Sequence, residues 1–200
     1  DTYILFGDPA TNLQLQPTHA LPLEAGWNLV SFNLQPLESS APEDVLAPIE
    51  GKYDLVYAYQ ADDLQDPWKI YDPTAPSYVN DLVSMNETQG YWIHMTEADT
   101  LAIPGNPPTS TDIPLWTTTG GWNLVGYPSA GAGTLPDVLR DHGVGEDFSL
   151  IYAYHADDLQ DPWKLYDPTA PGYVNDLTEM TPGWGYWIHV SADHTWQVDY

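Results

Sequence analysis

The chain has 200 residues, 42% of them hydrophobic, which predicts a packed core and excludes a disordered tail. Its 29 Asp and Glu residues against 4 Lys and Arg give a formal net charge of -25, which excludes nucleic acid as a partner and disfavours anionic membranes. Cysteine is absent, which excludes disulfides and thiol nucleophiles, and apolar runs are too short for membrane insertion.

Residues 1–19 form a segment without a counterpart later in the chain. The segment predicts two short strands, whose apolar side chains are Tyr3, Ile4, Leu5, Phe6, Leu13 and Leu15. It could fold back onto the unit that follows. Alternatively, it could add a strand to the sheet of a neighbouring molecule, as in donor-strand complementation, and such head-to-tail contacts would propagate into a filament.

Residues 20–105 predict a small antiparallel sheet with one short helix. The expected strands are 27–34, 55–59, 68–71, 91–95 and 100–103. In the first strand the apolar phase changes between Leu29 and Val30, which indicates a bulge or burial on both faces. The helix is expected after Ser40, which has capping-box spacing to Glu43. The residues that it would bury are Val45, Leu46 and Ile49.

The turn between the second and third strands is rich in aspartate. Calcium binds roughly six to eight oxygen ligands and favours carboxylates clustered on a turn, so the turn is a candidate calcium site. Aspartate is also an ordinary turn and cap residue, so a structural role is the alternative. The candidate ligands are Asp62, Asp63 and Asp66, with Asp157, Asp158 and Asp161 in the corresponding turn, and Asp72, Asn80 and Asp81 could complete the first site.

Alternation in strand 91–95 places Trp92 and His94 on the same face. These side chains could cover the sheet against the helix or against another unit. Alternatively, they could belong to an aromatic platform that stacks on sugars. The tryptophans of such a platform would be Trp68, Trp92, Trp163 and Trp187, and Tyr71 and Tyr78 could join them.

Residues 106–112 predict a linker, and residues 113–200 repeat the unit at 20–105. A shift of 95 residues aligns Gly26–Val30 with Gly121–Val125, and Ala61–Lys69 recurs unchanged later in the chain. The predicted fold is therefore β-rich α+β, with two tandem copies of one unit. Because a unit of about 85 residues buries only about 60 to 65% of its unfolded surface, we expect the copies to pack together.

The run Tyr3–Ala10 resembles the stretch that closes the catalytic region of gingipain-like cysteine peptidases. The units, each with a Gly-Trp-Asn-Leu-Val start and a Gly-Tyr-Trp-Ile end, resemble tandem modules at the C-terminal end of large secreted bacterial surface proteins. These resemblances imply a piece of a secreted multidomain precursor. Peptidase activity is not carried over, because the chain has no Cys to match the catalytic one.

Two further features bear on where the protein acts. Asn86-Glu87-Thr88 is an N-glycosylation sequon, which favours a secreted or cell-surface location. The chain begins at Asp1 rather than Met, so we expect a processed product or a fragment.

Motifs for nucleophilic, zinc-dependent or phosphate-binding chemistry do not stand out, so we predict no catalytic residues and no enzyme. The leading hypothesis is a structural or interaction module of the cell surface that requires no cofactor. It would self-assemble through residues 1–16, with other copies or surface components as partners. The alternative is a calcium-assisted carbohydrate-binding module of a secreted multidomain enzyme, with glycans as partners.

Overall fold

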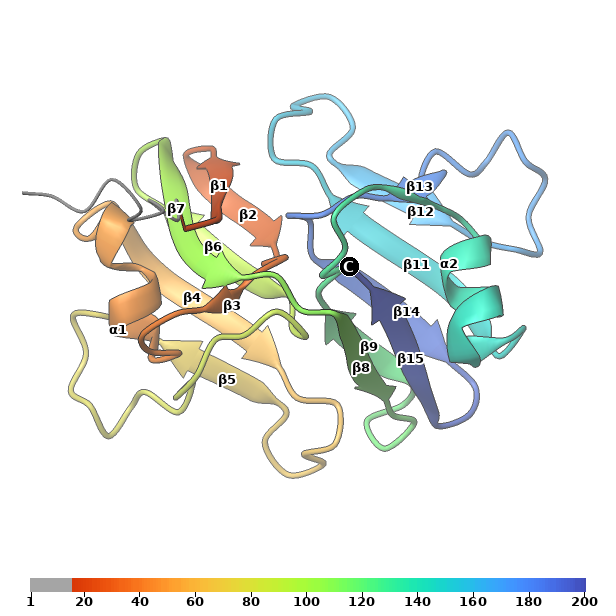
Figure 1. The fold of residues 1–200 in the computed structure, drawn as a ribbon, viewed down its shortest axis with the longest axis horizontal. Coiled ribbons are helices and arrows are strands. Elements are labelled where there is room, and N and C mark those ends of the chain that lie inside the picture. The colour runs from red at the N-terminus through yellow and green to blue at the C-terminus, as the bar shows by residue number, and fades with distance from the viewer. Residues whose placement is uncertain (1–15) are drawn as a thin grey trace, which may run out of the picture.

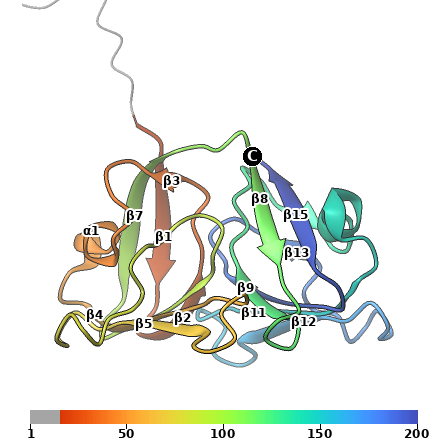
Figure 2. The ribbon, with the colours of Figure 1, turned by 90° about the horizontal axis from the view of Figure 1, so that it is seen from below.

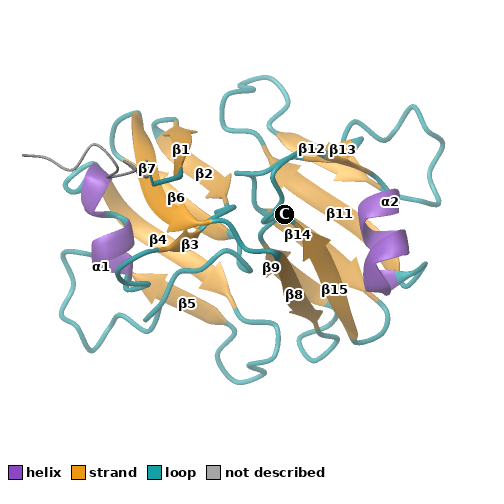
Figure 3. Cartoon of the chain, viewed as in Figure 1, coloured by secondary structure: helices purple, strands orange, loops and turns teal. Residues whose placement is uncertain are grey.

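The computed structural model describes residues 16–200, which form a β-rich fold with several antiparallel sheets and few helices, as expected (Figures 1 and 3). The first half contains β1 (Thr18–Leu23), β2 (Gly26–Val30), β3 (Gln35–Pro36), α1 (Pro42–Val45), η1 (Ala47–Ile49), β4 (Tyr53–Tyr59), β5 (Trp68–Tyr71), β6 (Tyr91–Met95) and β7 (Asp99–Asn106). The second half contains β8 (Ser110–Leu115), β9 (Trp122–Val125), β10 (Gly133–Thr134), α2 (Asp137–Leu139), η2 (Arg140–Val144), β11 (Phe148–Tyr154), β12 (Trp163–Tyr166), β13 (Glu179–Met180), β14 (Tyr186–Val190) and β15 (His194–Asp199). Within residues 16–200, the helices are too short or too polar to cross a membrane.

Each half has one main four-stranded sheet. The strand order is β2-β6-β4-β5 in the first half and β9-β14-β11-β12 in the second. In both sheets the central pair carries a register shift near its start, between Tyr53 and Leu55 and between Phe148 and Leu150. Figure 2 shows the two main sheets along one side of the molecule, with the pairs β1–β7 and β8–β15 above them.

Each main sheet buries one face in a core of its own. In β6 the alternating side chains of Tyr91, Ile93 and Met95 point into the first core, which α1 and η1 cover through Leu46 and other residues. The second core contains Trp196, which is fully buried. Each fully buried aliphatic side chain stabilises the fold by roughly 1.5 to 3 kcal/mol, so the burial of these inner faces stabilises each half separately.

The predicted capping box at Ser40 is wrong. The helix α1 begins after Ala41, and in the described residues no side chain caps it. The carbonyl of Ser40 instead accepts a hydrogen bond from the amide of Met85 at 2.6 Å, which ties this residue to the core and leaves Pro42 to begin the helix. The predicted burial of Val45, Leu46 and Ile49 is confirmed.

Several predicted boundaries differ from the structure because backbone pairing extends or ends a strand. The strand predicted at 55–59 begins at Tyr53, the strand predicted at 100–103 runs from Asp99 to Asn106, and β1 crosses the boundary predicted after residue 19. The strand predicted at 27–34 leaves the sheet after Val30, although Leu29 and Val30 are both buried, as predicted. The range 106–112 predicted as a linker is mostly paired, since β7 reaches Asn106 and β8 begins at Ser110.

The two halves meet along a seam of backbone pairing. Val30 pairs with Trp184, and Gln89 pairs with Val125, each as an isolated antiparallel bridge. These bridges join main-chain groups and so fix the position of one sheet against the other. Further bonds across the seam run from Ser31 N to Gly183 O (3.0 Å) and from Gly126 N to Thr88 O (3.0 Å).

Candidate functional site

The outer surfaces of the two main sheets carry aromatic rings where a solvent-facing sheet usually carries polar residues. In β4, Tyr57 and Tyr59 alternate with the buried Val56 and Ala58, so their rings point away from the core. We name this surface the aromatic face. Its members are Trp27, Tyr57, Tyr59, Trp68 and Trp92 from the first half, and Trp122, Tyr152, Tyr154, Trp163 and Trp187 from the second.

Several rings of this face are open to solvent. Trp27 is 37% exposed, Trp68 45% and Trp163 46%. Contiguous exposed apolar patches are uncommon on soluble proteins and usually mark a binding surface. The aromatic face is therefore the first candidate for function.

Four rings of the first half line a shallow cavity, widely open to solvent, that we name cup 1. The rings of Trp27 and Tyr57 are near-parallel, with centroids 6.0 Å apart and an interplanar angle of 26°. Trp92 stands at 86° to Trp27, and Trp68 stands at 80° to Tyr57. The cavity measures about 520 Å³ and is lined by these four side chains.

The second half holds the corresponding arrangement, cup 2. Trp122 and Tyr152 lie 5.9 Å apart at 33°. Trp187 stands at 83° to Trp122, and Trp163 stands at 88° to Tyr152. Its cavity, also about 520 Å³, is bordered in addition by Tyr59 and Trp68 of the first half.

The four tryptophans predicted as a platform meet in pairs across the seam. The ring centroids of Trp92 and Trp163 are 5.7 Å apart, and so are those of Trp68 and Trp187. Cover of Trp92 by the helix is wrong, because α1 lies on the core side of the sheet. Trp92 does contact the other half, yet it still lines cup 1. Tyr71 packs against the core, so its predicted place on the platform is wrong, and Tyr78 is 88% exposed in a loop after β5.

A histidine borders each cup, and its partner differs between the halves. His94 lies 4.8 Å from the ring of Trp27, and its Nδ1 is 2.6 Å from Asp54 Oδ1. His189 lies 5.0 Å from Trp122, but its Nδ1 is 2.7 Å from the hydroxyl of Ser149. Cup 1 therefore has a carboxylate at its rim where cup 2 has a neutral hydroxyl.

Sequence reasoning missed six members of this face. The signal was present, because Tyr57-Ala58-Tyr59 alternates and the Gly-Trp-Asn-Leu-Val run recurs, but alternation alone does not show which side of a strand faces the core. The missed residues are Trp27, Tyr57, Tyr59, Trp122, Tyr152 and Tyr154.

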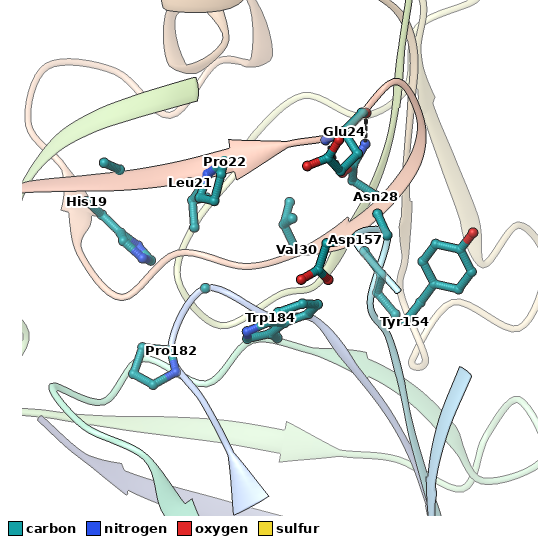
Figure 4. A pocket seen from close by; sticks show the side chains of 14 residues that line it. His19, Leu21, Pro22, Glu24, Asn28, Val30, Tyr154, Asp157, Pro182 and Trp184 are labelled. Carbon is teal, nitrogen blue, oxygen red and sulfur yellow. Dashed lines mark hydrogen bonds between the residues drawn. The ribbon is translucent and has the colours of Figure 1, made fainter. Parts of the chain in front are cut away.

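A third cavity, the seam pocket, lies between the halves and measures about 260 Å³ (Figure 4). His19, Glu24 and Asp157 line it together with Trp184 and apolar groups. The Nδ1 atom of His19 accepts a hydrogen bond from the amide of Asn33 at 3.2 Å, and burial lowers the pKa of this imidazole. The seam pocket is thus lined by the imidazole of His19 and by the exposed carboxylates of Glu24 and Asp157. Its volume is half that of either cup.

The aspartate turns bind their own chain. Asp63 Oδ2 accepts a hydrogen bond from Lys69 Nζ at 2.9 Å, which holds the pKa of the Asp63 carboxyl below its usual range, and Asp158 binds Lys164 at 2.8 Å in the same way. The same turns contain Asp62 and Asp157. They also contain Asp66 and Asp161, which lie farther from the same two lysines. In residues 16–200, the acidic and imidazole side chains do not gather into a group of three suited to a metal ion.

The other residues expected to complete a calcium site also bind the backbone. Asp81 Oδ1 accepts from the amide of Ile70 at 2.6 Å, and Asn80 Oδ1 accepts from the amide of Asp72 at 2.9 Å. This geometry accounts for the aspartates by turn formation, and calcium stays a prediction without structural support.

The sequon residue Asn86 turns its side chain back on the chain, because its Oδ1 accepts from the amide and the hydroxyl of Thr88 at 3.0 and 2.6 Å. Glycosylation there stays a prediction. The residues predicted to mediate assembly lie outside the described part of the chain, namely Tyr3, Ile4, Leu5, Phe6, Leu13 and Leu15.

Comparison with protein-family models, with curated proteins and with solved structures found no match to this chain.

Proposed function

We propose that this chain is a non-catalytic binding module of secreted or cell-surface origin, and that its aromatic face binds an extended carbohydrate chain. The observation that carries the proposal is the continuity of the face, since Trp92 contacts Trp163 and Trp68 contacts Trp187 across the seam. A face that spans both halves suits a polymer better than a single small ligand.

The chemistry of the face suits sugars in two ways. Indole and phenol rings supply flat apolar surfaces on which the C–H groups of a pyranose stack, and their polar edges remain available for hydrogen bonds. The hydroxyls of Tyr57 and Tyr152 and the imidazoles at the rims could bind sugar hydroxyls. Because the rings also pack against one another, little side-chain freedom is lost on binding.

The proposal includes an origin by duplication of one unit. The strand orders of the two main sheets correspond, and the ring distances in cup 1 and cup 2 agree within a few tenths of an ångström. Two equivalent cups on one surface would bind a repeating polymer with an effective local concentration that a single cup lacks.

The test is affinity electrophoresis of the purified chain through gels that contain neutral polysaccharides of different linkage, supported by a glycan array. We expect retardation in at least one gel, and we expect Trp163→Ala to remove most of it, because Trp163 lines cup 2 and contacts Trp92. Tyr173→Ala is the matched control, since Tyr173 is 90% exposed and belongs to a loop outside the aromatic face.

Equal mobility of all variants in every gel would contradict the proposal. If the chain is then a dimer that Trp163→Ala dissociates, the aromatic face is an interface between copies. Assembly through residues 1–16 is a separate expectation, and negative-stain microscopy of the intact and truncated chains tests it.

A further inference from the structure

The geometry of the cups points to a second class of ligand: we propose that each cup binds an N-alkylated ammonium group such as trimethylammonium, and that cup 1 binds it more tightly than cup 2. This inference shares with the proposed function the requirement that the aromatic face is open. It does not require that the face binds sugar.

The orientation of the rings suits a cation. In each cup two rings inclined at 26 or 33° to each other are each flanked by a further ring that stands at 80 to 88° to it. A cation placed among rings with different orientations meets several electron-rich faces, and cation–π attraction is strongest for tryptophan. Three of the four rings in each cup are indoles.

The chemistry of the lining suits a quaternary ammonium. Cup 1 is lined by the side chains of Trp27, Tyr57, Trp68 and Trp92, which present ring faces and edges. A metal ion or a primary ammonium would lose hydrogen bonds to water on entering such a cavity. A quaternary ammonium has no N–H group and spreads its charge over its methyl groups, so it suffers this loss least.

The charge of the chain also suits a cation. The formal net charge of -25 attracts cations to the whole surface. The lysines on the strands that bear Trp68 and Trp163 are engaged by carboxylates, with Lys69 2.9 Å from Asp63 and Lys164 2.8 Å from Asp158. Their charges are therefore offset close to the cups.

The rim distinguishes the cups. Asp54 holds His94 beside Trp27, whereas Ser149 holds His189 beside Trp122. Cup 1 therefore has a carboxylate at the rim position where cup 2 has a neutral hydroxyl, whereas Lys52 and Asp147 at the next equivalent position are bound by a carboxylate and an imidazole, respectively. From Coulomb attraction across about 10 Å of mostly aqueous medium, we expect an affinity about twofold higher at cup 1 in dilute salt.

The experiment titrates the full chain with choline and, in parallel, with dimethylbutanol, the uncharged analogue in which carbon replaces the nitrogen. The readout is the indole N–H region of the NMR spectrum, which reports each tryptophan separately. We expect choline to bind about five- to thirtyfold more tightly than its neutral analogue. Trp27→Ala should remove the cup 1 response alone, and Trp122→Ala the cup 2 response alone.

An exchange of the rim residues tests the ranking. Asp54→Ser should lower the choline affinity of cup 1 about twofold, and Ser149→Asp should raise that of cup 2 by the same factor. Both effects should disappear at about 0.5 M salt, where screening is strong. Tyr173→Ala should leave both cups unchanged.

Equal affinity for choline and its neutral analogue would overturn the inference, because the cups would then be merely apolar. If the chain is retarded in polysaccharide gels but does not bind choline, the inference is overturned and the proposed function stands. Failure in both assays by a chain that dimerises through the aromatic face would overturn both.

Discussion

In each half, the hydroxyl of one buried tyrosine forms hydrogen bonds that stabilise a backbone turn. Tyr91 is fully buried, and its hydroxyl accepts from the amide of Asn86 at 2.7 Å and donates to the carbonyl of the same residue at 3.1 Å. Tyr186 binds Thr181 in the same way, at 2.6 and 3.2 Å. Burial raises the pKa of both phenols, so they remain neutral donors.

We predict that Tyr91→Phe and Tyr186→Phe each lower the free energy of unfolding by about 1 to 2 kcal/mol, because each leaves a backbone amide without its acceptor. Urea unfolding followed by tryptophan fluorescence measures the change. Tyr173→Phe is the control, since Tyr173 is 90% exposed and should change nothing. Equal stability of all three variants would mean that water replaces the lost hydroxyls.

His155 gives the seam a defined response to pH. Its ring lies 3.6 Å from that of Trp184, and burial lowers its pKa, against the opposing effect of nearby Asp157. Below the ordinary histidine pKa of about 6.5, the unfolded chain binds a proton that the folded chain resists, so this contribution to stability falls as pH falls.

We therefore predict that the free energy of unfolding of His155→Gln, which cannot take up that proton, is lower than that of the unmodified chain at about pH 7.5. The difference between the two proteins should become smaller as the pH falls to about 5.5. Using the difference between the two proteins removes the effect of all other titrating groups. Thermal melts across this range provide the measurement, and a deficit that widens on acidification would contradict the assigned direction.

The sequence predicted which side chains of one strand share a face. It did not predict which side chains of neighbouring strands contact one another. Alternation placed Trp92 and His94 on one face, because a strand has a period of two. The contact of His94 with Asp54 depends on the register shift between Tyr53 and Leu55, which adds a residue that alternation does not count.

At the scale of elements, glycines on the seam allow two backbones to approach. A Cβ atom on Gly126 would lie 2.4 Å from the carbonyl oxygen of Glu87 and 3.1 Å from Ser31 Cβ. On Gly185 it would lie 2.9 Å from the carbonyl oxygen of Val30. Both contacts involve main-chain atoms, which cannot turn aside as a flexible side chain can.

We predict that Gly126→Ala lowers the free energy of unfolding by about 1 to 3 kcal/mol, the usual effect of overpacking, and that Gly185→Ala does so to a smaller extent. Gly172→Ala is the matched control, because no described atom lies within 4 Å of its Cβ position. That variant should be neutral or slightly stabilising. Calorimetry ranks the three, and a stable Gly126→Ala protein would show that the seam can open without cost.

The elements themselves were predictable where local pattern decides them. The strands at 68–71 and 91–95 have the predicted bounds, since apolar alternation and flanking turns define them. The seam was not predictable, because Val30 pairs with Trp184 through main-chain groups, which carry no trace in the residue types. The capping-box spacing did not predict the start of helix α1, since Ala41 and not Ser40 occupies the N-cap position, while the Ser40 carbonyl binds the amide of Met85.

At the scale of the whole molecule, two properties coexist: a large negative charge and an open aromatic face. A formal charge of -25 makes copies of the chain repel one another, which opposes association through exposed rings such as those of Trp68 and Trp163. The same charge repels itself within the fold and lowers its stability. Adding salt should therefore increase the stability of this protein.

We predict that raising NaCl from about 10 mM to about 500 mM increases the melting temperature by several degrees, because screening shortens the range of repulsion from about 30 Å to a few ångströms. Salt would also weaken the ion pairs, such as Lys52 with Asp99, but these are few and at least partly open to solvent, so their loss is smaller than the gain from screened repulsion. Magnesium and calcium chloride at equal ionic strength should raise the melting temperature equally. A larger rise with calcium would show that the chain binds that ion specifically, and loss of the difference in Asp62→Asn would assign it to the turn at Asp62–Asp66. A fall with any salt would mean that attraction outweighs repulsion on this surface.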